Sequence, residues 1–105
     1  MRLTNIELGT ELKLNIHIDP IDGQTINDFN YEIEAYCTPT KKVVKERLDT
    51  IRRDNDIIVC LDTKEVGTGE LICKVTAYIH DGDFADAHRT EVVVVKTGIN
   101  IVRTA

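Results

Sequence analysis

The chain of 105 residues has no tryptophan and no serine, and aromatic residues make up only 5% of it. Without serine there is no serine nucleophile for the three histidines to activate, and nothing else in the pattern indicates an enzyme. A sugar-binding platform would depend on Tyr31, Tyr36 or Tyr78. Because large aromatic rings are scarce, Ile, Val and Leu must fill the interior, and these residues favour strands over helices.

Positive charge is also limited, and the formal net charge is −5. We therefore expect no nucleic-acid partner, because affinity for phosphate backbones requires clustered Lys and Arg. Residues 1–5 lack the apolar core of a signal peptide, and no apolar run approaches the length of a membrane span. We expect no membrane partner and assembly in a reducing cytoplasm. The length and the 42% apolar content predict a single domain over residues 1–105.

The clearest strand signal lies in residues 70–80, where apolar and polar side chains alternate with a period of two. An acidic turn follows at 81–86, and residues 89–96 then form a second run that is rich in valine. These two runs predict a long antiparallel hairpin at the centre of the fold. Because 92–95 is apolar at every position, we expect apolar cover on both of its faces, from a second sheet, from the chain's tail or from another subunit.

Further strands are predicted at 11–18, 30–38 and 57–61, and 98–102 would add a short strand or dock the tail. Residues 41–47 are ambiguous: the apolar positions around them fit a helical stripe, but adjacent valines and a missing cap favour one or two edge strands. The turns at 19–23 and 67–69 carry proline or glycine. The pattern predicts an all-β fold, an immunoglobulin-like antiparallel β-sandwich of about seven strands.

Three cysteines, Cys37, Cys60 and Cys73, show no metal-ligand spacing. We interpret them as small apolar residues of the interior. The alternative is a Cys37–Cys73 disulfide that imitates the bridge between the sheets of immunoglobulin domains.

The acidic turn is the one constellation that resembles a ligand site. Asp81, Asp83 and Asp86, with His88 nearby, offer oxygen and nitrogen ligands to a cation, but they lack the register of a helix-flanked calcium loop. A solvated turn explains the same residues, so we predict no metal and no cofactor. Phe84 within this polar turn either folds back onto the domain or is offered to a partner.

Several short motifs resemble a small immunoglobulin-like domain of structural proteins from tailed phages and prophages of Bacteroides-type bacteria, including the crAss-like group. They are Tyr36-Cys37, 41–43, 54–63, 67–71, 81–86 and 89–92. The domain is similar in layout to the attachment domain at the N-terminus of baseplate and fibre proteins. His80 and Ala85 stand where that pattern usually has proline.

The resemblance implies a non-enzymatic virion structural protein that decorates a capsid or attaches a fibre or adaptor. Its partners would be capsid, fibre or baseplate proteins and further copies of itself, as a homo-oligomer assembled in the bacterial cytoplasm and located in the virion. We expect the partner contacts to be Asp83, Phe84, Asp86, Arg89, Val92 and Val94. The alternative is a carbohydrate- or peptide-binding module of a bacterial surface system.

Overall fold

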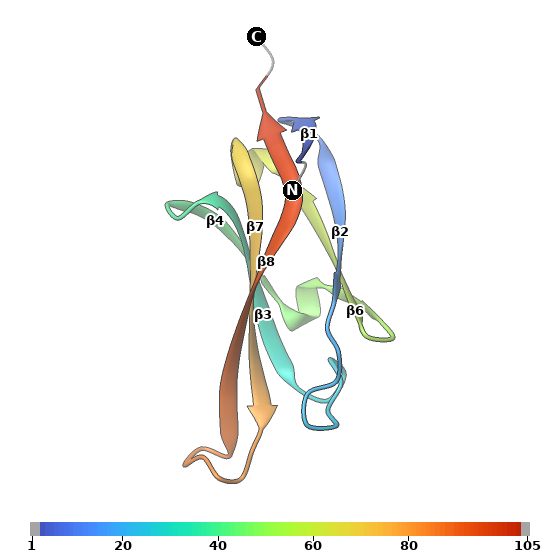
Figure 1. The fold of residues 1–105 in the computed structure, drawn as a ribbon, viewed down its shortest axis with the longest axis vertical. Helices are drawn as coiled ribbons and strands as arrows, with labels where there is room; N and C mark the ends of the chain where they lie inside the picture. Colours follow the sequence, from blue (N-terminus) through green and yellow to red (C-terminus); the bar gives the residue numbers. More distant parts are fainter. Residues whose placement is uncertain (1–2, 104–105) are drawn as a thin grey trace.

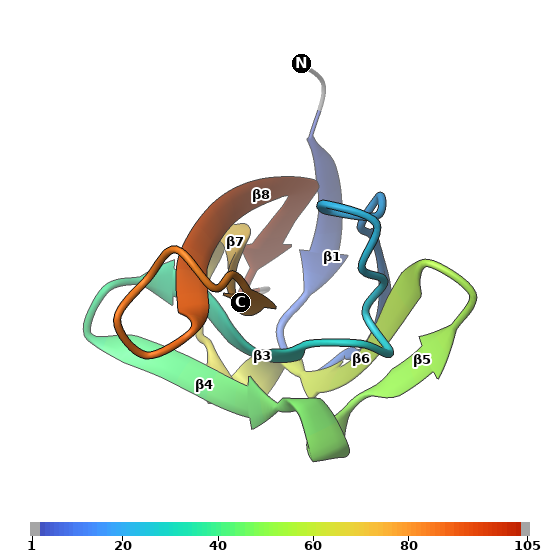
Figure 2. The same cartoon turned by 90° about the horizontal axis from the view of Figure 1, so that it is seen from below.

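The computed structural model describes residues 3–103, which form an all-β sandwich of two sheets. The larger sheet has the strand order β1-β8-β7-β3-β4, and the smaller has the order β2-β6-β5 (Figures 1 and 2). The larger sheet contains β1 (Thr4–Glu7), β3 (Asn30–Thr38), β4 (Lys41–Glu46), β7 (Gly69–His80) and β8 (His88–Val102). The smaller contains β2 (Glu11–His17), β5 (Ile51–Arg53) and β6 (Asp56–Asp62). This arrangement is the predicted immunoglobulin-like sandwich.

The alternating strands place their apolar side chains between the two sheets, as predicted. Ile33 and Ala35 of β3 and Leu71 and Val75 of β7 are buried, and so are Leu14 and Ile16 of β2. Tyr31 is the largest of the fully buried side chains. Its hydroxyl pairs with the hydroxyl of buried Thr50 at 2.5 Å, so the one polar tip in this part of the core has a partner.

The expected central hairpin is formed by β7 and β8, and it runs the length of a molecule that measures 54 × 28 × 27 Å (Figure 1). β8 is a single strand of 15 residues, so residues 98–102 continue it instead of forming a strand of their own. Gly69 begins β7 with a φ of +121°, and a Cβ there would lie 3.4 Å from Cys37 Cβ. The glycines of 67–69 therefore serve the predicted turn.

One pairing departs from the predicted antiparallel architecture. β1, which the sequence pattern did not indicate, pairs in parallel with the end of β8, from Thr4 opposite Ile99 to Glu7 opposite Val102. Four residues without alternation carry no strand signal of their own. The parallel pair makes the larger sheet mixed and raises the strand number to eight. Met1 and Arg2 of the start lie outside the described residues.

The ambiguous segment after residue 40 forms edge strands, and the helical interpretation is wrong. β4 closes the larger sheet and β5 closes the smaller one, with a short 3-10 turn (Arg47–Asp49) between them. A second 3-10 turn, Thr63–Glu65, follows β6. No helix within residues 3–103 has the length and apolar character that crossing a bilayer requires.

The cysteine predictions are corrected in two respects. All three thiols are free, so no Cys37–Cys73 bridge forms, and both residues lie in the same sheet rather than in facing sheets. Cys60 is exposed, although it lies in the central strand of the smaller sheet, because the outer face of that sheet is open to solvent. Of the three cysteines, Cys73 alone is fully buried, as predicted, and Cys37 is half-buried.

Candidate docking surface

The lower half of β8 is a free sheet edge. β1 covers only Ile99 to Val102, so residues 88–98 have β7 on one side and no strand on the other among residues 3–103. Such an edge presents unpaired backbone N–H and C=O groups and is a template for a further strand.

Three consecutive valines are exposed along this edge: Val92 at 52%, Val93 at 42% and Val94 at 57%. Val92 and Val94 lie on the outer face of the sheet, opposite Thr76 and Lys74, while Val93 lies on the inner face opposite Val75. Of the sources of cover predicted for this run, neither the second sheet nor the tail covers these three valines within residues 3–103, and cover by another subunit stays a prediction; Val95 is half-buried against the core. Within residues 3–103 this part of β8 pairs with β7 alone.

The edges formed by β4, β5 and β2 are protected against pairing. β4 carries Lys41, Lys42 and Lys45, and Lys45 lies opposite Ile33 on the inward-facing side. β5 is only three residues long and ends in two arginines, and β2 carries Lys13 and His17. Short length, lysine and inward-pointing charge are the usual defences of edge strands. In β8 the charges lie at the ends of the valine run, at Glu91 and Lys96, and the run itself has none.

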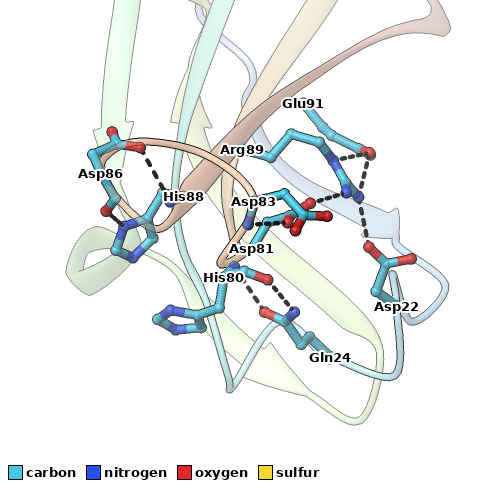
Figure 3. A network of polar contacts seen from close by, with 9 residues as sticks. All are labelled: Asp22, Gln24, His80, Asp81, Asp83, Asp86, His88, Arg89 and Glu91. Atoms are coloured by element: carbon cyan, nitrogen blue, oxygen red, sulfur yellow. Dashed lines mark hydrogen bonds and ion pairs between the residues drawn. The ribbon is translucent and has the colours of Figure 1, made fainter.

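Arg89 fastens the lower end of β8 to two other segments (Figure 3). Its guanidinium donates to Asp81 at 2.6 Å, to Asp22 at 2.8 Å and, through Nε, to Glu91 at 3.2 Å. Hydrogen bonds with Asp22 first, and then with Glu91 and Asp81, raise the pKa of Arg89 above its ordinary value. The arginine is thus tied to the hairpin turn and to the loop after β2.

Gln24 joins the same loop to the end of β7. Its side-chain amide donates to the His80 carbonyl at 2.9 Å and accepts from the His80 N–H at 3.0 Å, like a residue of a neighbouring strand (Figure 3). Loop 18–29 is therefore held to the hairpin by two side chains, Asp22 and Gln24. Neither was a candidate from sequence, because the pairing partners are more than 50 residues away.

His80 and His88 lie directly opposite each other across the hairpin, with ring centroids 4.8 Å apart. His80 Nε2 lies 3.0 Å from the Asp28 carbonyl, and His88 Nδ1 lies 2.9 Å from the Asp86 carbonyl. A carbonyl only accepts, so each of these nitrogens is the donor in its hydrogen bond. Beside the rings is a shallow hollow of about 480 Å³ lined also by Asn30, Glu32 and Tyr78.

The acidic turn has the local geometry of a solvated loop. Asp81 Oδ1 accepts from the Asp83 N–H, and Asp86 Oδ1 accepts from the His88 N–H, which are side-chain turns of the kind aspartate favours. Within residues 3–103 no three His, Cys, Asp or Glu side chains are arranged to hold a metal ion. Phe84 is 48% exposed at the tip and does not fold into the core.

The predicted contact residues thus fall into two groups. Asp83, Phe84 and Asp86 lie at the exposed tip, and Val92 and Val94 lie together on the outer face of β8. Arg89 differs from both groups, since its guanidinium is engaged by three carboxylates. Val93 is also exposed along this edge, but it was not among the predicted contact residues. Alternation along β8 places it on the inner face, where burial would be expected.

Comparison of the chain with protein-family models, with curated proteins and with solved structures gives no match.

Proposed function

We propose that this chain is a non-enzymatic docking module of a virus particle, which binds a protein partner by adding a strand to the free edge of β8. The particle role is the one that the phage-domain resemblance implies: capsid decoration, or attachment of a fibre or adaptor. The observation that carries the docking mode is the unprotected run Val92–Val95, set beside three edges that lysine, arginine or short length protects.

Strand addition supplies affinity and specificity by different means. Main-chain hydrogen bonds along 89–97 would provide most of the affinity. Val92 and Val94 on one face and Val93 on the other would select apolar neighbours on the incoming strand. The turn between β7 and β8 lies at the lower end of the hairpin (Figure 1), and its exposed residues Asp83, Phe84 and Asp86 would add contacts at one end of the interface.

The particle role is tested by quantitative mass spectrometry of virus particles purified from the source culture. The proposal expects the chain to co-purify with the capsid protein at a fixed ratio through a density gradient. A chain that stays in the soluble fraction while capsid protein sediments would contradict the particle role.

The docking mode is tested by hydrogen exchange in the isolated chain, diluted until sedimentation shows it to be monomeric, and in the particle. We expect amides of 89–97 to become protected in the particle, while amides of β4 at the opposite edge of the same sheet keep their exchange rates. Equal exchange of the β8 amides in both states would contradict strand addition, whatever the location of the protein.

A further inference from the structure

We infer that the strand added to β8 is β8 of a second copy, running antiparallel about a two-fold axis at Val93 and making one continuous ten-stranded sheet. This inference rests on the proposed docking at the β8 edge and names its partner. Two identical edges that meet about an axis perpendicular to the sheet are antiparallel, and each keeps its outer face outward. Outer residues then pair with outer residues and inner with inner. The two strands can therefore shift past each other only by two residues at a time, which moves the two-fold axis from one residue to the next.

With the axis at Val93, the side chains that face each other across the interface are compatible in polarity and charge. Residues equally distant from Val93 face each other: Val93 meets its own copy, and Val92 meets the partner's Val94. One step further, Glu91 faces Val95, and then Thr90 faces Lys96. No like charges lie opposite each other, and the paired stretch 89–97 fits within the free edge, because β1 begins its pairing at Ile99.

The neighbouring registers fit less well. An axis at Val92 sets Glu91 opposite Val93 and Arg89 opposite Val95, so two charged residues face valine instead of one. An axis at Val94 leads Arg89 toward Ile99, where β1 already occupies the edge. The valine run is thus self-complementary about Val93, which favours a second copy over a strand of unrelated sequence.

Sedimentation equilibrium of the full chain and two matched lysine variants tests the self-association. Val94→Lys places a charge at the centre of the proposed interface, and Val44→Lys places one on the opposite edge of the same sheet, where Val44 is 48% exposed. We expect a dimer for the wild type and for Val44→Lys, and at least a tenfold higher Kd for Val94→Lys. A wild type that is monomeric at the highest concentration, or equal weakening by both variants, would overturn the inference.

Circular dichroism of Val94→Lys, with its thermal transition, separates loss of the interface from loss of the fold. Because Val94 is exposed, we expect a folded spectrum with a transition like that of Val44→Lys. If Val94→Lys does not fold, the cysteine cross-linking described next tests the dimer instead, because it introduces no lysine.

Cysteine cross-linking tests the register in a Cys60→Ser background, since Cys60 is the exposed native thiol. Directly opposed residues lie about 4.5–5.5 Å apart between Cα atoms, within the range of a disulfide. Val93→Cys should therefore give covalent dimers on mild oxidation. Val92→Cys alone should not, because its own copy is displaced by two residues, to about 8 Å. A mixture of Val92→Cys and Val94→Cys should give the heterodimer.

Cross-linking of Val92→Cys to itself with none for Val93→Cys would overturn the register, and no cross-linking at any of these positions would overturn the second copy. The proposed function fails separately. A monomeric chain found in particles with protected β8 amides would contradict only the second copy, while a cross-linked dimer absent from particles would contradict only the particle role.

Discussion

Val75 and Val93 lie directly opposite each other on β7 and β8, yet Val75 is 3% exposed and Val93 is 42% exposed. Both point toward the same face of the larger sheet. The difference arises because β7 lies between β8 and β3, whereas β8 at this position is an edge with β7 alone beside it among the described residues. The burial of this apolar pair therefore depends on position within the sheet and not on residue type.

Truncation of these two valines should have unequal effects on stability. We expect Val75→Ala to lower the free energy of unfolding by about 2 kcal/mol, from lost apolar burial and the remaining cavity. Val93→Ala should lower it by less than about 0.5 kcal/mol in dilute protein, because the side chain is already in contact with water. Urea unfolding at low protein concentration measures both, and equal losses would contradict this difference in burial.

The free edge of β8 also marks the limit of what sequence can predict here. Alternation located β2, β3 and β7 and their buried faces, because a period of two directly reports which side chains share a face. The run 92–95 was correctly predicted as a strand. Its β-branched composition indicates only a preference for strand and does not indicate what covers the strand. Whether the side chains of this strand are covered depends on its neighbours in space, which come from distant parts of the sequence. The contacts of Arg89 with Asp22 and of Gln24 with His80 were equally hidden, because they join distant loops.

Removal of the Tyr31 hydroxyl should cost more than removal of the Tyr78 hydroxyl. Tyr31 is 1% exposed and pairs with buried Thr50, so Tyr31→Phe should lower the free energy of unfolding by about 1 kcal/mol. Tyr78 contacts Glu32 at 3.4 Å at a half-buried position, and we expect Tyr78→Phe to change stability by less than about 0.5 kcal/mol. Chemical unfolding of the two variants in parallel measures the difference, and a larger loss for Tyr78→Phe would contradict it.

The three thiols should react at distinct rates. Burial raises the pKa of Cys73 to about 11 and also raises the pKa of Cys37, whose sulfur lies 3.4 Å from the Gly69 carbonyl. Because the thiolate is the nucleophile, both should resist a disulfide reagent at neutral pH in the folded protein. We expect one thiol per folded chain to react rapidly and all three after unfolding in guanidinium. Cys60→Ser should abolish the rapid phase, and a rapid phase that survives would contradict the assignment.

The pairing of His17 with Asp56 should make stability depend on pH. These residues are opposite each other on β2 and β6, with 2.7 Å between Nδ1 and the carboxylate, and Asp19 contacts the other ring nitrogen. The hydrogen bond with Asp56, and then that with Asp19, raise the pKa of His17, while the hydrogen bond with His17 lowers the pKa of Asp56. The histidine contribution is present below its ordinary pKa of 6.5 and is lost as pH rises through the higher folded value.

The aspartate contribution has the opposite sign: it is present above the ordinary pKa of 3.8 and is lost as pH falls through the lower folded value. We therefore expect the stability difference between wild type and His17→Gln to be largest between pH 3.8 and 6.5 and to vanish at alkaline pH. Urea unfolding across this range measures it. Asp19→Asn should lose a smaller part, since the bond to Asp56 remains. A difference that grows with rising pH would contradict the assignment.

Replacement of Arg89 should loosen two segments without unfolding the sandwich. Arg89→Gln removes the ion pairs with Asp81 and Asp22, which join the hairpin turn to loop 18–29. Gln24 still holds that loop to His80, so we expect faster hydrogen exchange in 18–24 and 81–88 but unchanged exchange in the buried part of β3. Arg53→Gln is the matched control, because Arg53 is an exposed arginine on the short strand β5. High salt should reproduce part of the Arg89→Gln effect in the wild type, because the cluster is only partly shielded from solvent. Unchanged exchange in both segments would contradict the prediction that the ion pairs of Arg89 hold loop 18–29 to the hairpin turn.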